Sequence, residues 1–234
     1  MKYFSLLLSI SFISVFGFGQ IVSDSIVLNQ LGFYPAAPKI AAVKGNTPPS
    51  PFSIINTKNN KIVYKGTLGE LRQSKNSSTQ TRIIDFSLFT KPGNYKINIP
   101  SVGDSYPFII GANANHPVAE ASLKGFYFIR SNIPLEERFA GKWHRAAGHP
   151  DTAVLVHSSA ASKERPEGTV ISTPGGWYDA GDYNKYIVNS GITMGTLLSA
   201  YEDFPAYFDT FKTNIPESGN GVPDILNEAI YNLR

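Results

Sequence analysis

The sequence has no cysteine among its 234 residues. Disulfide bonds are therefore excluded, although exported proteins commonly use them, and so is a zinc site built on thiolates. The folded state must be held by a hydrophobic core, with or without metal ions. Any metal site must use histidine, carboxylate or carbonyl ligands.

An excess of charge of one sign is also missing. The sequence has 21 basic and 18 acidic residues, which gives a formal net charge of +3. The basic residues are scattered along the chain and form no patch that would attract a nucleic acid backbone. We therefore expect a small or uncharged partner, and no nucleic acid.

Long apolar runs are absent except at the start of the chain. Residues 4–16 are predominantly apolar, follow Lys2 and precede the small residues Gly17 and Gly19. This arrangement is typical of a secretory signal peptide, here residues 1–19, with cleavage after Gly19. A membrane anchor is the alternative, but the run falls short of the roughly 20 residues that a spanning helix requires. The sequence thus predicts a secreted protein, extracellular or periplasmic, without a membrane span.

Residues 20–112 have the pattern of a β-sandwich. Short runs rich in β-branched and aromatic residues recur between residues 23 and 111, and residues 57–61 (TKNNK) have the composition of a hairpin turn. Seven or so strands in about 90 residues indicate a module of the immunoglobulin type. The Cys…Trp…Cys signature of antibody domains is absent, so the pattern predicts the architecture alone.

Helical spacing of apolar residues begins after Gly111. It recurs in residues 116–132, 185–204 and 221–234, and Pro223 and Asp224 suit the first turn of the last helix. Residues 133–183 read as one loop, rich in Pro, Gly, Ser and His. Three helices and a loop of about 50 residues do not close a helical core. Residues 113–234 are therefore interpreted as the first, incomplete part of a helical domain, with the chain ending inside a helical pattern.

The stretch TPGGWYDAGDYNKY, residues 173–186, is the strongest candidate for a functional site. Gly175, Gly176 and Gly181 disfavour a regular helix and suit a backbone with positive φ. In such a bend, Asp179 and Asp182 would face one small volume. Their mutual repulsion would raise the proton affinity of the pair, so that one carboxylate acts as a base toward a bridging water.

Aromatic side chains flank these two carboxylates. Their flat apolar faces suit the C–H groups of sugar rings, whose hydroxyls in turn need carboxylate and amide acceptors. The candidate substrate-binding residues are Trp177, Tyr178 and Tyr183, with Tyr186 nearby.

Three other interpretations of the acidic pair stay open. Asp182 would cap a helix that starts near Asn184. Asp179 would form an Asx turn. In the third interpretation the pair binds calcium, although its spacing differs from that of an EF-hand loop.

The segment GGWYDAGDYNKY, followed by a long apolar helix, resembles the catalytic-base motif of glycoside hydrolase family 9, whose members are mostly cellulases. VLNQLGFYPAAPKIAAV resembles the opening of the immunoglobulin-like module that precedes many of their catalytic domains. IPESGNGVPDILNEA resembles the segment that leads into their third barrel helix. The resemblance extends over nearly all of residues 24–234. It implies a multidomain fold, an all-β immunoglobulin-like sandwich followed by the first part of an all-α (α/α)6 barrel.

The resemblance also implies an activity and roles for the matched residues. Asp182 takes the position of the general base that activates water, and Asp179 that of the residue that helps to hold the same water. The family inverts the anomeric centre, which fits a base and an acid about 6.5–9.5 Å apart. The acid of the family is a glutamate far beyond Arg234, and no glutamate of this chain takes that role. We expect a monomeric hydrolase of β-1,4-glucosidic bonds in cellulose or related β-glucans, and no hydrolysis by these 234 residues alone.

Metal ions are a secondary expectation. Some relatives carry a Cys-His pair before the acidic motif that contributes to a zinc site, but Gly148 stands where the cysteine would be. His144, His149 and His157 are the histidines of this region, and a lone loop histidine is more often a hydrogen-bonding surface residue than a ligand. Zinc is therefore not expected. Calcium is known in the family, but its ligands are not located in this sequence, and no cofactor is required.

A non-catalytic role is the alternative. The chain would then be a polysaccharide-binding or accessory protein that uses its β-module and aromatic loop. In enzymes of this type the β-module more often braces the barrel than binds sugar, so we expect a structural role for it.

Overall fold

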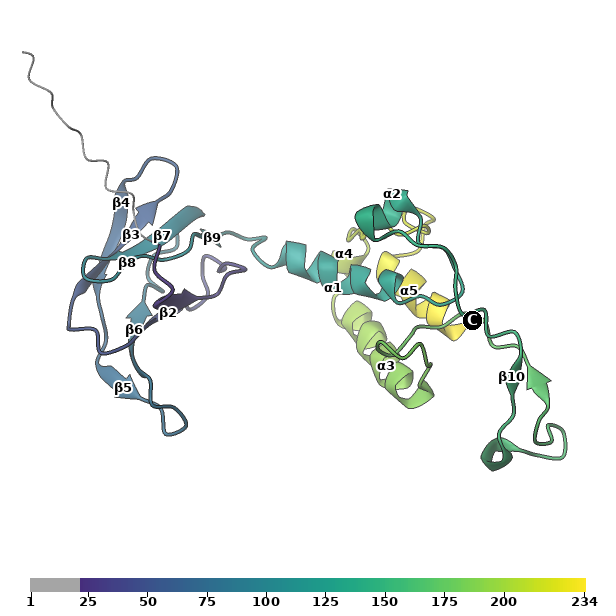
Figure 1. The fold of residues 1–234 in the computed structure, drawn as a ribbon. Helices are drawn as coiled ribbons and strands as arrows, with labels where there is room; N and C mark the ends of the chain where they lie inside the picture. The colour runs from purple at the N-terminus through teal and green to yellow at the C-terminus, as the bar shows by residue number, and fades with distance from the viewer. Residues whose placement is uncertain (1–21) are drawn as a thin grey trace, which may run out of the picture. The chain divides into compact units, whose positions relative to one another are not determined.

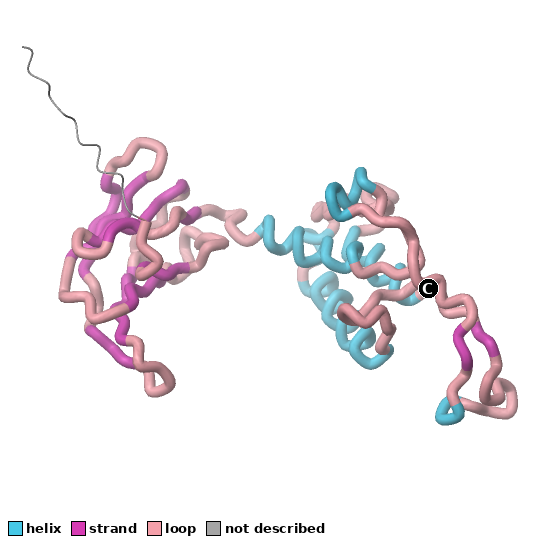
Figure 2. Tube along the Cα trace, viewed as in Figure 1, coloured by secondary structure: helices cyan, strands magenta, loops and turns pink. Residues whose placement is uncertain are grey.

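A computed structural model describes residues 22–234, and these divide into two compact units that separate between Ala114 and Asn115. The predicted signal peptide, residues 1–19, lies outside the described residues. The first unit is built of strands and the second mainly of helices (Figures 1 and 2).

The first unit is a sandwich of two antiparallel sheets. The sheet order β1-β2-β6-β5 uses β1 (Ile26–Leu28), β2 (Ile40–Lys44), β5 (Leu71–Gln73) and β6 (Gln80–Asp85). The order β4-β3-β7-β8 uses β3 (Pro51–Asn56), β4 (Ile62–Thr67), β7 (Gly93–Ile99) and β8 (Gly103–Asp104), and β9 (Phe108–Ile110) also pairs with β7. The predicted hairpin turn connects β3 with β4.

Alternation along the strands builds the core of this sandwich. In β7 every second side chain is buried, namely Tyr95, Ile97 and Ile99, because successive side chains of a strand point to opposite faces. Residues from both sheets join in one hydrophobic cluster, in which the rings of Phe33, Phe86 and Phe108 meet. The predicted antiparallel sandwich is confirmed.

The second unit contains three longer helices, α1 (His116–Phe128), α3 (Ile187–Asp203) and α5 (Asp224–Leu233). Both α1 and α3 pack against α5, with an apolar cluster between them that includes Leu123, Met194 and Ile225. The predicted helical region is confirmed. The last helix begins at Asp224, and Pro223 precedes it as an extended residue (ψ 140°) and not as part of the first turn.

The segment predicted as one long loop contains short elements. These are α2 (Glu137–Ala140), a 3-10 turn at Gly141–Trp143, a hairpin of β10 (Val154–Leu155) and β11 (Val170–Ile171), and a 3-10 turn at Ser158–Ala160. The hairpin extends away from the three helices (Figure 1). A further short helix, α4 (Pro205–Phe208), follows α3. Two-residue strands and single turns leave too little periodic pattern to be recognised in a sequence.

Candidate active site

The stretch 173–186 is attached to the end of α1 by strand-like pairing. The backbone N–H of Ser131 donates to Gly176 O (3.0 Å), and that of Tyr178 donates to Ile129 O (2.8 Å). The Ser131 hydroxyl adds a bond to Gly175 O (2.6 Å). The start of the stretch is therefore fixed, and the residues after Tyr178 form a loop that returns to α3.

Lys185 closes this loop. Its ammonium donates to Thr173 O (2.5 Å) and Gly175 O (3.0 Å), and it forms an ion pair with Asp151 (2.7 Å). Gly175 and Gly176 both have positive φ, 83° and 76°, which is why glycine suits these positions.

The third glycine of the loop does not have the predicted conformation. Gly181 has no positive φ, whereas Tyr183, two residues later, has φ 58°. This conformation is uncommon for a residue with a side chain, and such strained positions gather at functional sites.

Asp182 is exposed and held by three hydrogen bonds. Its Oδ2 accepts from the Tyr186 hydroxyl (2.8 Å) and from Asn184 Nδ2 (3.3 Å), and its Oδ1 accepts from the backbone N–H of Asn184 (3.2 Å). These bonds stabilise the anion and so hold the pKa of the Asp182 carboxyl below its ordinary value. The bond from Tyr186 has the largest effect. The shift is opposite in direction to the rise expected from repulsion between the two carboxylates.

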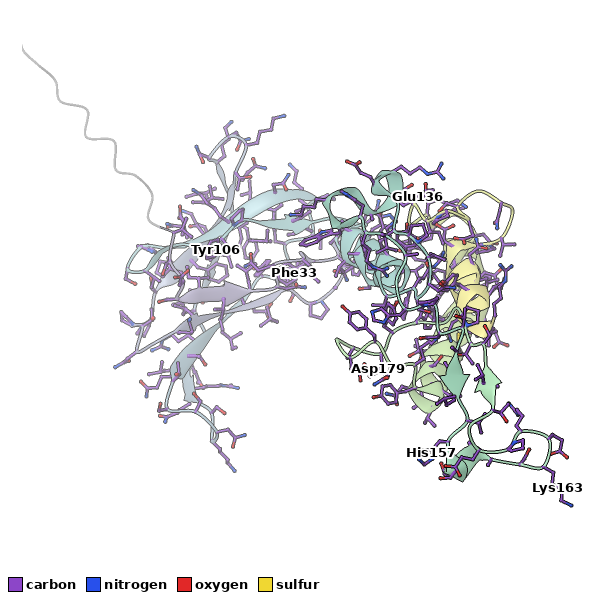
Figure 3. The ribbon with its side chains drawn as sticks, turned by 45° about the vertical axis from the view of Figure 1, so that its right-hand side comes forward. Phe33, Tyr106, Glu136, His157, Lys163 and Asp179 are labelled. Atoms are coloured by element: carbon purple, nitrogen blue, oxygen red, sulfur yellow. The ribbon has the colours of Figure 1, made fainter. Side chains whose placement is uncertain are left out.

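Asp179 is exposed as well, and a residue of α3 holds it. Asn189 Nδ2 donates to its Oδ1 (2.9 Å), while its own backbone N–H donates to Asn184 O (3.0 Å). Asp179 and Asn189 also line a small cavity of about 200 Å³ beside α3. Figure 3 shows Asp179 in the loop next to α3.

These contacts distinguish between the interpretations of the acidic pair. Helix α3 starts at Ile187, with Tyr186 at its N-cap position, so Asp182 does not cap it. Asp182 instead makes the Asx turn, with the N–H two residues on, and Asp179 accepts from Asn189. Both carboxylates keep contact with solvent, as a water-activating site requires. Their catalytic roles stay predictions.

The three candidate sugar-binding rings lie in different surroundings. Trp177 and Tyr178 expose only 7% and 6% of their surface. Trp177 packs on Phe126, with ring centroids 4.7 Å apart, so its ring faces the core. Tyr183 is 54% exposed and stacks on His149 at 4.1 Å, which leaves it as the ring most accessible to a ligand.

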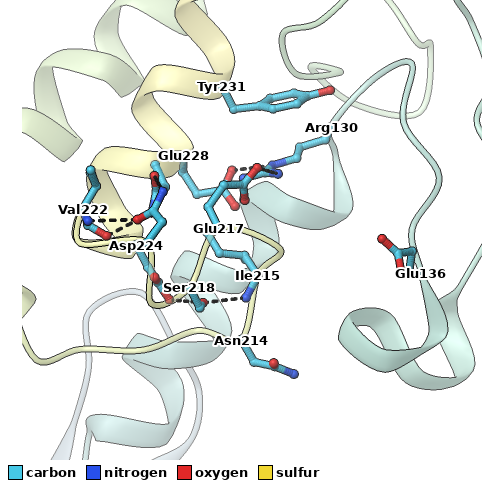
Figure 4. Close-up of polar contacts among 12 residues, drawn as sticks. Arg130, Glu136, Asn214, Ile215, Glu217, Ser218, Val222, Asp224, Glu228 and Tyr231 are labelled. Carbon is cyan, nitrogen blue, oxygen red and sulfur yellow. Dashed lines mark hydrogen bonds and ion pairs between the residues drawn. The ribbon is translucent and has the colours of Figure 1, made fainter.

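A buried charged cluster, which the sequence did not reveal, joins Arg130, Glu217 and Glu228 (Figure 4). Arg130 and Glu228 are fully buried, and Arg130 Nε donates to Glu228 Oε2 (3.0 Å). The two terminal nitrogens of Arg130 make a bidentate contact with Glu217, each at 3.0 Å, and its guanidinium lies over the Tyr231 ring at 4.3 Å. Its members come from three separate segments, the end of α1, residues 215–220 and α5.

Burial raises the pKa of Glu228 to about 7. The attraction of Arg130 and a contact from the Trp177 side chain oppose this rise, and the nearby Glu217 adds to it. One guanidinium charge is shared by two carboxylates, so it does not fully compensate the loss of hydration of Glu228. Arg130 and Glu228 expose no side-chain surface, whereas the Glu217 side chain is 35% exposed.

The three histidines of the region between α2 and α3 each make local contacts. His144 Nδ1 lies 3.0 Å from Gly141 O, His157 Nδ1 lies 3.0 Å from Ser159 Oγ, and His149 stacks on Tyr183. His157 lies at the far end of the β10–β11 hairpin, away from Asp179 (Figure 3). Within residues 22–234, no three His, Asp or Glu side chains are grouped so that they could bind a metal ion. The absence of zinc stays a prediction, and calcium stays a prediction without assigned ligands.

The same described part of the chain has no helix with the length and hydropathy to span a membrane.

Two family models match the chain, one for each unit. The cellulase N-terminal ig-like domain matches residues 22–104, and glycosyl hydrolase family 9 matches residues 116–234. The second match lies over the whole of the candidate site, and the first lies over the sandwich.

Individual relatives agree with these models. The chain is 46% identical over 213 residues to the xyloglucan-specific endo-β-1,4-glucanase of Bacteroides ovatus. The matched region covers 91% of this chain and 36% of that protein. It is 31% identical over 207 residues to endoglucanase D of Acetivibrio thermocellus, covering 88% of this chain and 32% of that protein. The chain thus spans about a third of the length of these curated relatives.

Solved structures are similar over both units. A family 9 structure from Bacteroides ovatus superposes with a TM-score of 0.85 at 46% identity, covering 91% of this chain and 38% of that one. A metagenome-derived family 9 endoglucanase superposes with a TM-score of 0.77 at 32% identity, covering 89% of this chain and 39% of that one.

Proposed function

This chain belongs to glycosyl hydrolase family 9, and we propose from that premise that the complete enzyme hydrolyses β-1,4-glucosidic bonds of cellulose or related β-glucans with inversion. The observation that carries the proposal is the placement of Asp179 and Asp182. Both are solvent-exposed and both are held in fixed positions by hydrogen bonds from α3 or the turn before it. An exposed anion held in this way is suited to bind and deprotonate a water molecule.

In the proposed reaction, Asp182 is the general base. Water attacks the anomeric carbon from the face opposite the leaving oxygen, so that one C–O bond forms as the glycosidic C–O bond breaks. The proton of the water passes to Asp182, and an acid gives a proton to the leaving oxygen. Asp179 accepts the second hydrogen of the water and orients it. A lowered pKa keeps Asp182 ionised, which is the state that a base requires.

The acid is not assigned to this chain. Glu228 is the glutamate with a pKa raised to about 7, but it is fully buried against Arg130 and does not reach a substrate. We therefore propose that these 234 residues alone do not hydrolyse glucan, since protonation of the leaving oxygen is one half of the mechanism.

The substrate class is proposed as a β-1,4-linked glucan. The relative with 46% identity is described as specific for xyloglucan, which supports soluble xyloglucan as the first substrate to test. Tyr183 is the one candidate ring with an open surface for a sugar in the loop. The predicted signal peptide supports secretion, and N-terminal sequencing of exported protein is expected to begin at Gln20. We further propose a monomer, for which light scattering is the test.

The test of the proposed function is Asp182→Asn in the complete enzyme. Loss of a general base is expected to lower turnover of a soluble glucan by about 10²–10⁴-fold. Asp203→Asn, at the exposed far end of α3, is the matched control and is expected to leave turnover unchanged. Turnover within about threefold of wild type for Asp182→Asn would refute the assignment. Glucan binding without hydrolysis by the wild-type complete protein would favour the non-catalytic alternative.

A further inference from the structure

We propose that Tyr186 and Asn189 are positioning residues of the site, through which the start of α3 holds Asp182 and Asp179. This inference rests on the proposed function, because it gives these two residues a role in the same reaction. The supporting observations are the two hydrogen bonds, the register of the helix and the absence of a side-chain cap at its start.

The register of α3 brings the two donors to one side of the helix. Tyr186 occupies the N-cap position and Asn189 is the third residue of the helix, so they are three apart. Residues with this spacing are neighbours on a helix surface. The Tyr186 hydroxyl donates to Asp182 Oδ2 (2.8 Å), and Asn189 Nδ2 donates to Asp179 Oδ1 (2.9 Å). The first turn of α3 and the extended N-cap residue before it thus hold both carboxylates, although these lie in an irregular loop.

The pattern of these bonds leaves acceptor positions for a water. On Asp182, Oδ2 accepts two side-chain hydrogen bonds, whereas Oδ1 accepts only that of the Asn184 N–H. On Asp179, Oδ1 accepts from Asn189. Each carboxylate oxygen has two lone pairs. The donors from α3 therefore orient the two groups while Oδ1 of Asp182 and Oδ2 of Asp179 keep room for a further hydrogen bond.

The start of α3 lacks the features that stabilise a helix end. Ser, Thr, Asp or Asn at the N-cap position would satisfy a free backbone N–H, but Tyr186 makes no such bond. Tyr186 is 45% exposed, and its backbone carbonyl accepts from the Ser190 N–H in the first turn (2.9 Å). Its hydroxyl makes no contact with the helix and instead contacts Asp182 and Asn184.

The other charged groups around Asp182 are engaged elsewhere. The Lys185 ammonium is bound to Thr173 O, Gly175 O and Asp151. His149 stacks on Tyr183, and Asp179 is the remaining anion of the loop. Tyr186 is thus the principal donor that lowers the pKa of Asp182, and loss of its hydroxyl is expected to raise that pKa.

The experiment compares Tyr186→Phe and Asn189→Leu with wild type in the complete enzyme, on soluble xyloglucan. Tyr186→Phe is expected to lower kcat about tenfold and to move the acidic limb of the kcat/KM profile to higher pH, with KM nearly unchanged. Asn189→Leu is expected to lower kcat by a similar factor. Asn189→Asp, which places a further anion against Asp179, is expected to move the acidic limb further upward.

Tyr201→Phe is the matched control. Tyr201 also lies on α3 and donates to an aspartate, Asp209 (3.0 Å), but away from the loop, and its variant is expected to keep the wild-type rate and profile. The proposal is overturned if Tyr186→Phe and Asn189→Leu both behave like Tyr201→Phe. If these variants are inert while Asp182→Asn abolishes turnover, the proposed function stands and only this inference fails. If Asp182→Asn is itself active, both fail.

Discussion

The sandwich and the helical unit use their interiors differently. The sandwich has one continuous hydrophobic cluster drawn from both sheets, whereas the helical unit has two smaller clusters. Both units bury charged side chains, Lys39 and Asp104 in the sandwich and Arg130 and Glu228 in the helical unit. Among residues 22–234, six non-glycine residues have positive φ, and only Asn60 of these belongs to the sandwich. Three of the other five, His149, Asp151 and Tyr183, surround the carboxylate loop.

This difference separates structural support from chemistry. In the sandwich the buried charges have partners: the Lys39 ammonium donates to two backbone carbonyls, and Asp104 forms an ion pair with Lys96. What distinguishes the helical unit is backbone strain next to its loop, a feature that gathers at functional sites. The contrast agrees with a bracing role for the sandwich, which stays a prediction, and with the placement of the candidate site in the helical unit.

The largest expected effect comes from removing the cation of the buried cluster. Arg130→Met leaves Glu228 without its partner in the core, and we expect the free energy of unfolding of the helical unit to fall by about 3–5 kcal/mol. Both tryptophans, Trp143 and Trp177, belong to this unit, so tryptophan fluorescence in urea reports it separately from the sandwich.

Arg138→Met is the matched control for that experiment. Arg138 forms an exposed ion pair with Glu136 (2.9 Å), and such pairs contribute about 0–1 kcal/mol. Equal losses for the two variants would contradict the account of the buried cluster.

The corresponding change in the sandwich is Ile97→Ala. Ile97 is fully buried in β7, and its truncation is expected to cost about 2–5 kcal/mol through lost burial and a cavity. Hydrogen exchange of the β7 amides should show this loss, while the transition seen by tryptophan fluorescence stays in place. Ile109→Ala, at a 48% exposed position of β9, serves as the control with a small expected effect. A shift of the fluorescence transition by Ile97→Ala would show that the two units do not unfold independently.

A smaller effect is expected from pH, and it should be confined to the helical unit. The folded state raises the pKa of Glu228 from 4.5 to about 7, so between these values the folded chain binds more protons than the unfolded chain. The contribution of Glu228 to the free energy of unfolding is therefore largest below pH 4.5. It falls as the pH rises through 7, by about 2 kcal/mol between pH 5 and pH 8.

Glu228→Gln should remove this slope, and Glu202→Gln, at an exposed position of α3, should not. The measurement is the urea midpoint of tryptophan fluorescence at several pH values. A slope of the opposite sign, or one that survives in Glu228→Gln, would disprove the account of this carboxyl.

The contrast also explains what the sequence could predict. Alternation along the strands and helical spacing in α3 are local patterns, and the helix predicted within residues 185–204 is observed at Ile187–Asp203. The Arg130 cluster was missed because its partners lie 87 and 98 residues further along the chain and no local pattern links them. The stretch 173–186 was singled out correctly as a loop, but composition did not reveal that Trp177 faces the core.

Local conformation within the loop was predicted only in part. Glycine composition identified the bend at Gly175 and Gly176, whereas the positive φ expected at Gly181 falls on Tyr183. Tyr183 lies directly before Asn184 and Lys185, whose hydrogen bonds close the loop. The support of both aspartates by Tyr186 and Asn189 needed the three-dimensional structure as well, since the side chains meet only once α3 has formed.

The most direct test of the central claim, that Asp179 and Asp182 act on one water molecule, is a double-mutant cycle in the complete enzyme. Turnover of a soluble glucan is measured for Asp179→Ala, Asp182→Ala and the double variant, with folding checked by circular dichroism. Residues that act as a unit have non-additive effects, so we expect the double variant to be about as slow as Asp182→Ala alone. A loss in the double variant equal to the product of the two single losses would contradict the claim.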